Sequence, residues 1–345
     1  MAARVNAPSL GAAGYQAPDT WTGAVSYRWQ RSDRHFVGDV EQTQRLTEHS
    51  EVINNINLLD VSVGYAFSKR FSANVSFPFQ FATRSQVVRS NDVAKTILTR
   101  FSTEAVGLGD IRMLATAWLL DPDQNKKQNI SLGLGVKFPT GEKDAVDTFQ
   151  VFDTNSLQIV ARTKTVDQSI QPGDGGYGII ADIYAFKEVF TNFNIFVAGT
   201  YIAAPQEKNG VNTFRYDPRL KTGNPFEAEM SIADQYLARA GFGYTFLPQY
   251  GLTFTLGGRI EGVPVRDLIG GSEGFRRPGF GVSIEPGLVY ARKGWTASLS
   301  APVALYRARE KSVPDNEFEV LKGKPQHGDA AFADFMILGS IAKSF

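Results

Sequence analysis

Alternation of apolar and polar residues recurs along almost the whole of this 345-residue chain. Between Leu59 and Phe67, for example, every second residue is large and apolar, and the residues between are small or polar. Successive side chains of a strand point to opposite faces, so this period of two residues predicts β-strands with one apolar face. The pattern predicts twelve strands, at about 21–30, 59–67, 71–81, 110–120, 129–138, 177–186, 192–203, 233–246, 252–262, 280–290, 295–306 and 334–345.

The links between these strands alternate between short and long. The short links are 68–70, 121–128, 187–191, 247–251 and 291–294, and the long links are about 31–52, 82–109, 139–176, 204–232, 263–279 and 307–333. An up-and-down meander with such links has tight turns at one end and long loops at the other, as bacterial outer-membrane barrels do. We therefore expect an all-β fold, a transmembrane up-and-down antiparallel β-barrel of about 12 strands, with short periplasmic turns and long extracellular loops. The barrel domain would cover 21–345 and follow a periplasmic N-terminal segment at 1–20.

A closed barrel suits this pattern better than membrane-spanning helices. The most helix-like uncharged run, 189–206, contains Gly199 and Pro205, and its apolar residues alternate instead of clustering. A tilted strand of roughly 9–11 residues crosses a bilayer, and closure gives every backbone group a partner in hydrocarbon. In 129–138 we expect Leu132 and Leu134 to face lipid and Lys137 to face inward.

Composition and chain ends narrow the setting. The chain has 36 Lys and Arg against 35 Asp and Glu, which gives no global electrostatic reason to bind nucleic acid. Zero cysteines exclude disulfide scaffolds, thiolate metal sites and cysteine nucleophiles. The first residues lack the apolar core of a signal peptide, so the protein is either cytosolic or the processed form of an exported one. The barrel pattern favours the processed form, in the bacterial outer membrane. Its expected partners are outer-membrane lipid, lipopolysaccharide and the barrel assembly machinery.

The C-terminal strand carries a further membrane signal. Aromatic residues flank the short turns and the opposite strand ends, where interfacial girdles belong. The last residue is itself aromatic, and the terminal segment resembles the signal that the outer-membrane assembly machinery reads. The residues proposed for this assembly signal are Phe335, Ile337, Ile341 and Phe345.

Three segments in the middle of the chain are similar to one family. They are 107–112 (GLGDIR), 133–141 (GLGVKFPTG) and 171–176 (QPGDGG). In this order they resemble the outer-membrane barrel transporters named for the meta pathway of phenol degradation, although Gly175-Gly176-Tyr177 replaces the usual Gly-Ser-aromatic. The resemblance implies passage of small, often aromatic or apolar, compounds. The conformational freedom of these glycines predicts bends or bulges in the backbone. They do not form a phosphate-binding loop, because no Lys-Ser/Thr follows them.

Alternation also predicts which charged residues face the lumen. Two interpretations stay open, a salt-bridge ladder that packs the interior and a selective path that guides solutes. The register of the sixth strand leaves the place of Asp182 open. The predicted lumen-lining residues are Arg28, Asp60, Arg112, Lys137, Asp182, Arg239, Arg259, Glu261 and Glu285.

One long loop has a helical spacing. In 91–101, Val93, Ile97 and Phe101 recur every four residues, and Asn91 or Asp92 is the candidate N-cap. This predicts a short amphipathic helix that gates the barrel mouth as a plug or caps the loop. The loop 139–176 is the second plug candidate.

Catalysis is the least favoured interpretation. All three histidines, His35, His49 and His327, fall in predicted loops, where a barrel phospholipase would need Ser and His on the wall. Asp33, His35 and Asp39 lie close enough in sequence for a protease-like site, but solvated loop polarity explains them better. We expect no catalytic residue, metal or cofactor. The sequence favours a channel or transporter for small, aromatic or hydrophobic solutes; the alternatives are a structural or partner-binding barrel and, third, an outer-membrane hydrolase.

Overall fold

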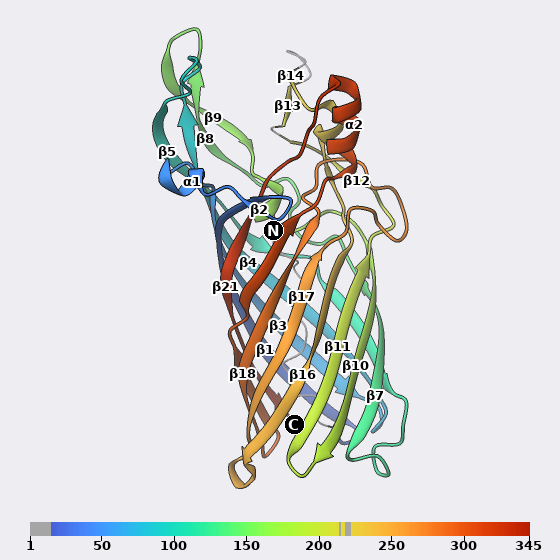
Figure 1. Ribbon diagram of the computed structural model, residues 1–345. Helices are drawn as coiled ribbons and strands as arrows, with labels where there is room; N and C mark the ends of the chain where they lie inside the picture. The colour runs from blue at the N-terminus through green and yellow to red at the C-terminus, as the bar shows by residue number, and fades with distance from the viewer. Residues whose placement is uncertain (1–14, 214, 218–221) are drawn as a thin grey trace.

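The computed structural model describes residues 15–213, 215–217 and 222–345, so most of the predicted N-terminal segment 1–20 lies outside the described residues. The chain forms a closed antiparallel barrel of twelve wall strands (Figure 1), which confirms the predicted fold class. The wall strands are β1 (Thr20–Val37), β3 (Ile53–Ala66), β4 (Phe71–Arg89), β5 with β6 (Ile97–Leu108, Arg112–Trp118), β7 (Gln128–Lys137), β10 (Gly178–Phe190), β11 (Phe193–Ala203), β16 (Gln235–Leu247), β17 (Leu252–Val263), β18 (Gly279–Arg292), β19 with β20 (Trp295–Ser300, Val303–Arg309) and β21 (Ala330–Ser344).

The first and last strands close the barrel. β21 pairs antiparallel with β1 from Thr22↔Ser344 to Phe36↔Ala330, with irregularities near Ser32. Each wall strand therefore has neighbours on both sides along its lower part, and no sheet edge is left open to hydrocarbon there.

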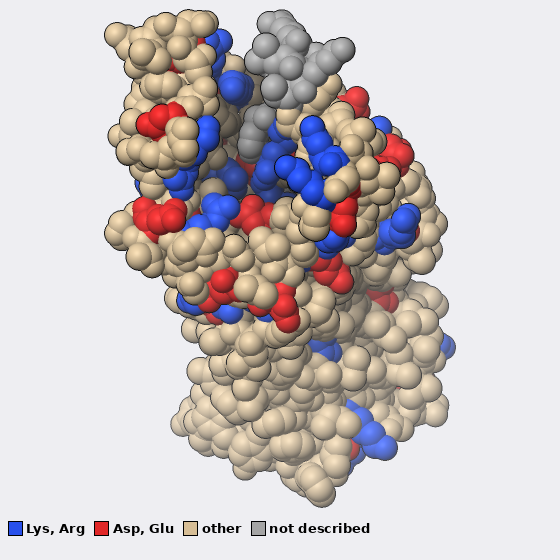
Figure 2. Space-filling model, turned by 45° about the horizontal axis from the view of Figure 1, so that its top comes forward, with Lys and Arg blue, Asp and Glu red and all other residues tan. Residues whose placement is uncertain are grey.

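The two faces of the wall differ as the alternation predicts. Leu132 and Leu134 on β7 are 45% and 68% exposed on the outside, whereas Lys137 on the inner face is 4% exposed. Figure 2 shows charged side chains gathered over the long-loop end and few on the wall below it. At the short-turn end the rings of Trp21 and Tyr65 lie 4.8 Å apart in an aromatic cluster on the outer surface. An apolar band with aromatic edges is the exterior that a bilayer requires.

The predicted helix at 91–101 is wrong. β4 continues to Arg89 and pairs with β5, so that Val93 lies exposed in their turn, Ile97 opens β5 and Phe101 sits opposite Gln86. The hairpin projects beyond the barrel rim beside β8 and β9 (Figure 1). An isolated helix this short is marginal, whereas strand pairing satisfies the backbone and suits the β-branched residues of the segment.

Small elements fill the long-loop end. Ser312 and Asp315 form a capping box at the start of α2. No helix among the described residues is long and apolar enough to cross a membrane. These elements are β2 (Val40–Glu41), α1 (Gln44–Thr47), β8 (Val146–Asp153), β9 (Gln158–Thr165), η1 (Gln168–Ile170), β12 (Lys208–Asn212), β13 (Tyr216–Asp217), β14 (Thr222–Gly223), η2 (Pro225–Glu227), β15 (Glu229–Ser231) and α2 (Val313–Lys322), while η3 (Pro248–Tyr250) forms a short turn.

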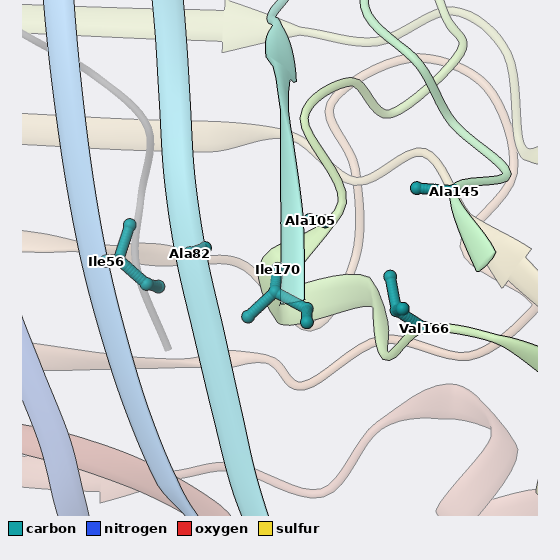
Figure 3. Packing of buried hydrophobic residues seen from close by; sticks show 6 residues of the cluster. All are labelled: Ile56, Ala82, Ala105, Ala145, Val166 and Ile170. Atoms are coloured by element: carbon teal, nitrogen blue, oxygen red, sulfur yellow. The ribbon is translucent and has the colours of Figure 1, made fainter. Parts of the chain in front are cut away.

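The loop 139–176 folds back onto the inner face of the wall. Its residues Val166 and Ile170 are fully buried against side chains from the upper parts of β3, β4 and β5 (Figure 3). Gln80 on β4 donates to the carbonyl oxygens of Ile170 and Gln171, at 2.7 and 3.0 Å. Apolar burial and these hydrogen bonds fix the loop at the barrel mouth. The cluster comprises Ile56, Ala82, Ala105, Ala145, Val166 and Ile170.

Candidate solute pathway

A chain of ion pairs lies across the middle of the barrel. Glu261 forms ion pairs with two arginines. Its Oε1 lies 2.6 Å from Nη2 of Arg28, and its Oε2 lies 2.5 Å from Nη2 of Arg259. Glu285 in turn contacts Arg239 at 3.2 Å and Arg259 at 3.6 Å. Every one of these side chains is 12% exposed or less. Because β1 and β17 are not neighbours in the wall, the Arg28–Glu261 pair joins strands with others between them.

A second group of ion pairs completes this layer on the β3–β7 side. Arg112 pairs with Asp60 across β4, and Lys137 pairs with Asp174 and lies 3.5 Å from Asp110. Of the nine predicted lumen residues, eight are therefore ion-paired, while Asp182 accepts a hydrogen bond from Thr200 at 2.6 Å. We call these eight the ionic belt: Arg28, Asp60, Arg112, Lys137, Arg239, Arg259, Glu261 and Glu285.

Neutral polar residues also take part in the layer, and the sequence reading missed them. Gln30 is 1% exposed and accepts two hydrogen bonds from Arg28, at 3.1 and 2.8 Å. Gln80 is 2% exposed and holds the backbone of the loop 139–176. Gln30 lies two residues after Arg28 on β1, so alternation places both side chains on the inner face. Gln30 was not predicted because only charged residues were considered for the lumen.

Two cavities lie on either side of the ionic belt. The upper cavity, of about 310 Å³, is lined along β1 by His35 and along β3 by Asn54. The lower cavity, of about 280 Å³, is lined by Thr22 on β1 and Ser62 on β3. Since the belt residues of these strands lie between those positions in sequence, the belt separates the two spaces.

The three segments that carry the family resemblance meet at one junction. Asp110 accepts from the backbone N–H of Gly141 at 3.0 Å and of Asp174 at 3.1 Å. A Cβ on Gly173 would lie 2.5 Å from the carbonyl oxygen of Gly141, so glycine is needed for this approach. Lys137 reaches Asp174 from the neighbouring strand. The motifs therefore join the loop 139–176 to the wall where β5 passes into β6.

Tyr15 contacts the inner face near the short turns. Its hydroxyl donates to the carbonyl oxygen of Asn125 at 2.5 Å and accepts from Asn129 at 3.0 Å. Its ring lies 5.1 Å from that of Trp118, which lines the lower cavity. The described part of the N-terminal segment thus lies at the lower end of the lumen.

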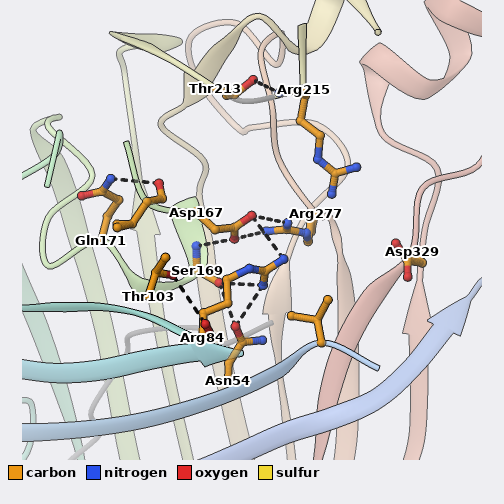
Figure 4. A network of polar contacts seen from close by, with 12 residues as sticks. Asn54, Arg84, Thr103, Asp167, Ser169, Gln171, Thr213, Arg215, Arg277 and Asp329 are labelled. Carbon is orange, nitrogen blue, oxygen red and sulfur yellow. Dashed lines mark hydrogen bonds and ion pairs between the residues drawn. The ribbon is translucent and has the colours of Figure 1, made fainter. Parts of the chain in front are cut away.

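Charged loop residues surround the upper cavity. Arg277 donates to both oxygens of Asp167, at 2.8 and 2.7 Å, and Arg84 lies 3.5 Å from the same carboxylate (Figure 4). Burial alone would raise the pKa of Asp167, but the guanidiniums of Arg277 and Arg84 outweigh it and hold that pKa well below its usual value. Asp167 is therefore ionised wherever the protein is folded near neutral pH.

The prediction that all three histidines lie in loops is wrong for His35, which lies on β1, and the side chains of His35 and His327 have structural partners. His35 contacts Asp329 through Nδ1 at 2.8 Å, and its Nε2 accepts from the backbone N–H of Val52 at 2.8 Å. The less favoured grouping of His35 with Asp33 and Asp39 does not form, since Arg31 pairs with Asp33 and Tyr306 contacts Asp39. His327 contacts the carbonyl oxygen of Arg309 through Nε2 at 2.8 Å, and His49 is exposed. Within the described residues no group of three or more metal-binding side chains is placed to hold an ion.

The predicted gate and assembly residues occupy different places. Phe101 packs on Phe149 of β8, with ring centroids 5.7 Å apart, and Val93 is solvent-exposed at the hairpin tip. The four residues proposed as the assembly signal belong to β21 and the terminal position after it, and all are exposed on the outer surface: Phe335, Ile337, Ile341 and Phe345.

Comparison with known proteins identifies a class of fold. No protein-family model matches the sequence, and no curated protein sequence matches it. The structure is similar to that of an outer-membrane channel from Pseudomonas putida F1, with a TM-score of 0.59, 11% identity, and coverage of 98% of this chain and 100% of that one. The β-domain of the Bordetella autotransporter BrkA gives a TM-score of 0.46 at 11% identity, covering 95% of this chain and 100% of that one. A mutant of the monoaromatic hydrocarbon channel TodX gives 0.45 at 9% identity, covering 96% and 91%. The first similarity shows that this chain has the fold of an outer-membrane β-barrel.

Proposed function

We propose that the protein is a channel or transporter for small solutes in the bacterial outer membrane. The observation that carries the proposal is a lumen with a cavity at each end and the ionic belt between them. The apolar exterior supports a membrane location, in which the short turns face the periplasm and the long loops face outward.

The solute class follows from the lower cavity and the resembling segments. Leu114, Trp118 and Tyr184 line the lower cavity together with small polar residues and with charged residues that include Asp182 and Arg239. The three large side chains provide apolar contacts for an aromatic or apolar body. The segments that resemble transporters of the phenol meta pathway support the same assignment, and we propose membership of that family on this basis.

The ionic belt also supports a second candidate function. Its side chains fill the middle of the barrel and pair with one another, as expected for a barrel whose interior is packed for stability alone. In that case the protein would be a structural or partner-binding barrel without transport.

Conductance measurements on the full chain in planar lipid bilayers discriminate the two. We expect single-channel events for the channel, and a changed ion selectivity for Arg259→Gln, since this removes a fixed positive charge from the path. Arg292→Gln, at an exposed position beside a short turn, is the matched control and should leave selectivity unchanged. A folded protein that stays closed at all voltages, and excludes small aromatic solutes from loaded liposomes, would support the structural barrel instead.

A further inference from the structure

The upper cavity has an unbalanced charge. Among the described residues that line it are two carboxylates, Asp174 and Asp329, against five arginines. The five are Arg45, Arg84, Arg215, Arg276 and Arg277.

Two of the five arginines are neutralised by their own partners. Arg276 donates to both oxygens of Asp267, at 2.7 and 2.6 Å, and Arg45 lies 2.6 Å from Asp329. Asp174 is likewise held by Lys137 of the ionic belt. These pairs leave the other three arginines to be balanced by different groups.

Arg84 and Arg277 contact the carboxylate of Asp167, and Arg215 lies near enough to both arginines for their charges to interact. Arg277 contacts this carboxylate with both terminal nitrogens and Arg84 approaches from the wall, as Figure 4 shows. Glu227 is the acidic group that acts most strongly on Arg215, and burial raises the pKa of Glu227 above its ordinary value while the charge of Arg215 lowers it. Burial and the charge of Arg277 lower the pKa of Arg215, the sign that the cations repel one another.

Arg84 also carries a donor without a partner. Its Nη1 donates to Asn54 at 2.9 Å, but its Nε is buried and makes no hydrogen bond within the protein. The side chain of Arg84 is only 8% exposed and lines the upper cavity. A buried donor left unsatisfied destabilises a fold, and an ordered water, an ion or a ligand can supply the missing acceptor.

We propose that the upper cavity binds a small organic carboxylate. Planar guanidiniums match the two oxygens of a carboxylate, and a cavity lined by an excess of arginines attracts an anion. Val52, Val263 and the pair Ala330 and Ala331 line the same cavity and provide contacts for an apolar body. The volume of about 310 Å³ suits a ligand of the size of an aromatic acid.

This inference deepens the proposed channel function, on which it rests for its biological meaning. The upper cavity lies at the long-loop end, before the ionic belt, so an anion entering there would meet these arginines first. Bound carboxylate would therefore be concentrated at the entrance of the path.

Binding to the full chain, folded in detergent, tests the proposal by isothermal titration calorimetry. Benzoate should bind at low salt and bind more weakly as salt is raised, because screening reduces the attraction. Benzyl alcohol, of similar size but uncharged, should bind at least about tenfold more weakly, as should inorganic phosphate, which satisfies charge but not the apolar lining. Equal binding of benzoate and benzyl alcohol would overturn the proposal, and so would phosphate binding as tightly as benzoate.

Two variants of opposite effect strengthen the test. Arg84→Gln should weaken benzoate binding about tenfold, since a charged donor is lost. Asp167→Asn should tighten it, because this removes the carboxylate that competes with the ligand for the arginines. Arg292→Gln is the control and should bind like the parent protein. Unchanged affinity in both cavity variants would overturn the site; if one variant does not fold, the other and the ligand series still decide.

Conductance on the same preparation separates this inference from the proposed function. A protein that conducts but does not bind benzoate contradicts the carboxylate site and retains the channel. A protein that binds benzoate but never conducts retains the site and contradicts the channel.

Discussion

Arginine and carboxylate side chains on the inner face hold strands together that are not hydrogen-bonded to each other. Arg28 reaches Glu261 from β1 to β17, Arg112 reaches Asp60 across β4, and Arg239 reaches Glu285 across β17. Each of these side chains is 13% exposed or less, so its removal from water is unfavourable unless its partner is present. The belt residues are therefore interdependent, and a single substitution affects several of them.

Glu261 is the belt residue whose loss we expect to destabilise the fold most, because it pairs with two arginines. Glu261→Gln leaves both Arg28 and Arg259 without their shared carboxylate, and we expect a loss of about 3 kcal/mol in unfolding free energy. Urea titration of the protein folded in detergent measures it. Glu273→Gln, at a half-exposed ion pair with Lys208, should change stability by less than about 1 kcal/mol. Equal effects of the two substitutions would show that the belt is not a coupled buried layer.

Asp329, at the mouth of the barrel, makes the stability of the fold depend on pH. Burial would raise the pKa of Asp329, but the hydrogen bond with His35 and the charge of Arg45 lower it below its usual value. A carboxyl group whose pKa is lower in the folded protein stabilises the fold at pH values above its pKa in the unfolded chain, which is about 4. This stabilisation is lost as the pH falls toward the pKa of the folded state. Asp329→Asn should thus be less stable than the parent at pH 7, and the difference should shrink below about pH 4. A difference that stays constant from pH 7 to pH 3 in thermal unfolding would contradict this account.

At the scale of the elements, the sequence predicts strand existence well and strand ends poorly. The twelve wall strands follow from a period of two residues, which is a local property of each segment. Above the membrane band, β4 and β5 continue through residues assigned to a loop, because polar strand residues there carry no alternation of hydrophobicity. The spacing of Val93, Ile97 and Phe101 fitted a helix equally well, and only pairing with β4 decides against it.

The site shows the same division. Alternation selected the inner-face charges, but their partners are up to 233 residues away in the chain, as for Arg28 and Glu261. Arg215, Arg276 and Arg277 were not selected, since they lie in loops where no period assigns a face. Their convergence on the upper cavity depends on how the loops fold over the mouth, which a local pattern does not encode.

The glycine contact between the loop 139–176 and the wall is the element-scale feature most open to test. Gly173→Ala places a methyl group 2.5 Å from the carbonyl oxygen of Gly141, so the loop must shift, at about 1–3 kcal/mol. We expect faster proteolysis of the loop and a larger conductance, because the loop leaves the barrel mouth. Gly258→Ala has nothing within 4 Å of the new methyl group and should behave like the parent protein. Identical proteolysis rates in the two variants would contradict a fixed loop.

For the molecule as a whole, closure of the barrel depends on the last strand, β21, which pairs with β1. The terminal residue, Phe345, lies outside β21, so its role can be tested without disturbing that pairing. Phe345 follows β21 and is 76% exposed, so it contributes little to packing. Phe345→Ser should leave folding into liposomes unchanged but reduce the amount in the outer membrane of producing cells, if the assembly machinery reads this residue. Phe67→Ser, at an aromatic residue 62% exposed at the same end, is the control. An equal reduction for both would assign the effect to lost interfacial anchoring instead.

The exterior of the barrel supplies the widest test, because its exposed apolar surface has opposite meanings in lipid and in water. Leu134, near the middle of β7, is 68% exposed, and in water its replacement by arginine would be nearly neutral. In a bilayer the same Leu134→Arg change should destabilise the folded barrel by about 2–4 kcal/mol, since a cation near the midplane loses its hydration. Leu268→Arg, at a loop residue 73% exposed, should be neutral in both media. Unfolding titrations in liposomes measure the difference, and a Leu134→Arg barrel as stable as the parent would mean that this face does not contact hydrocarbon.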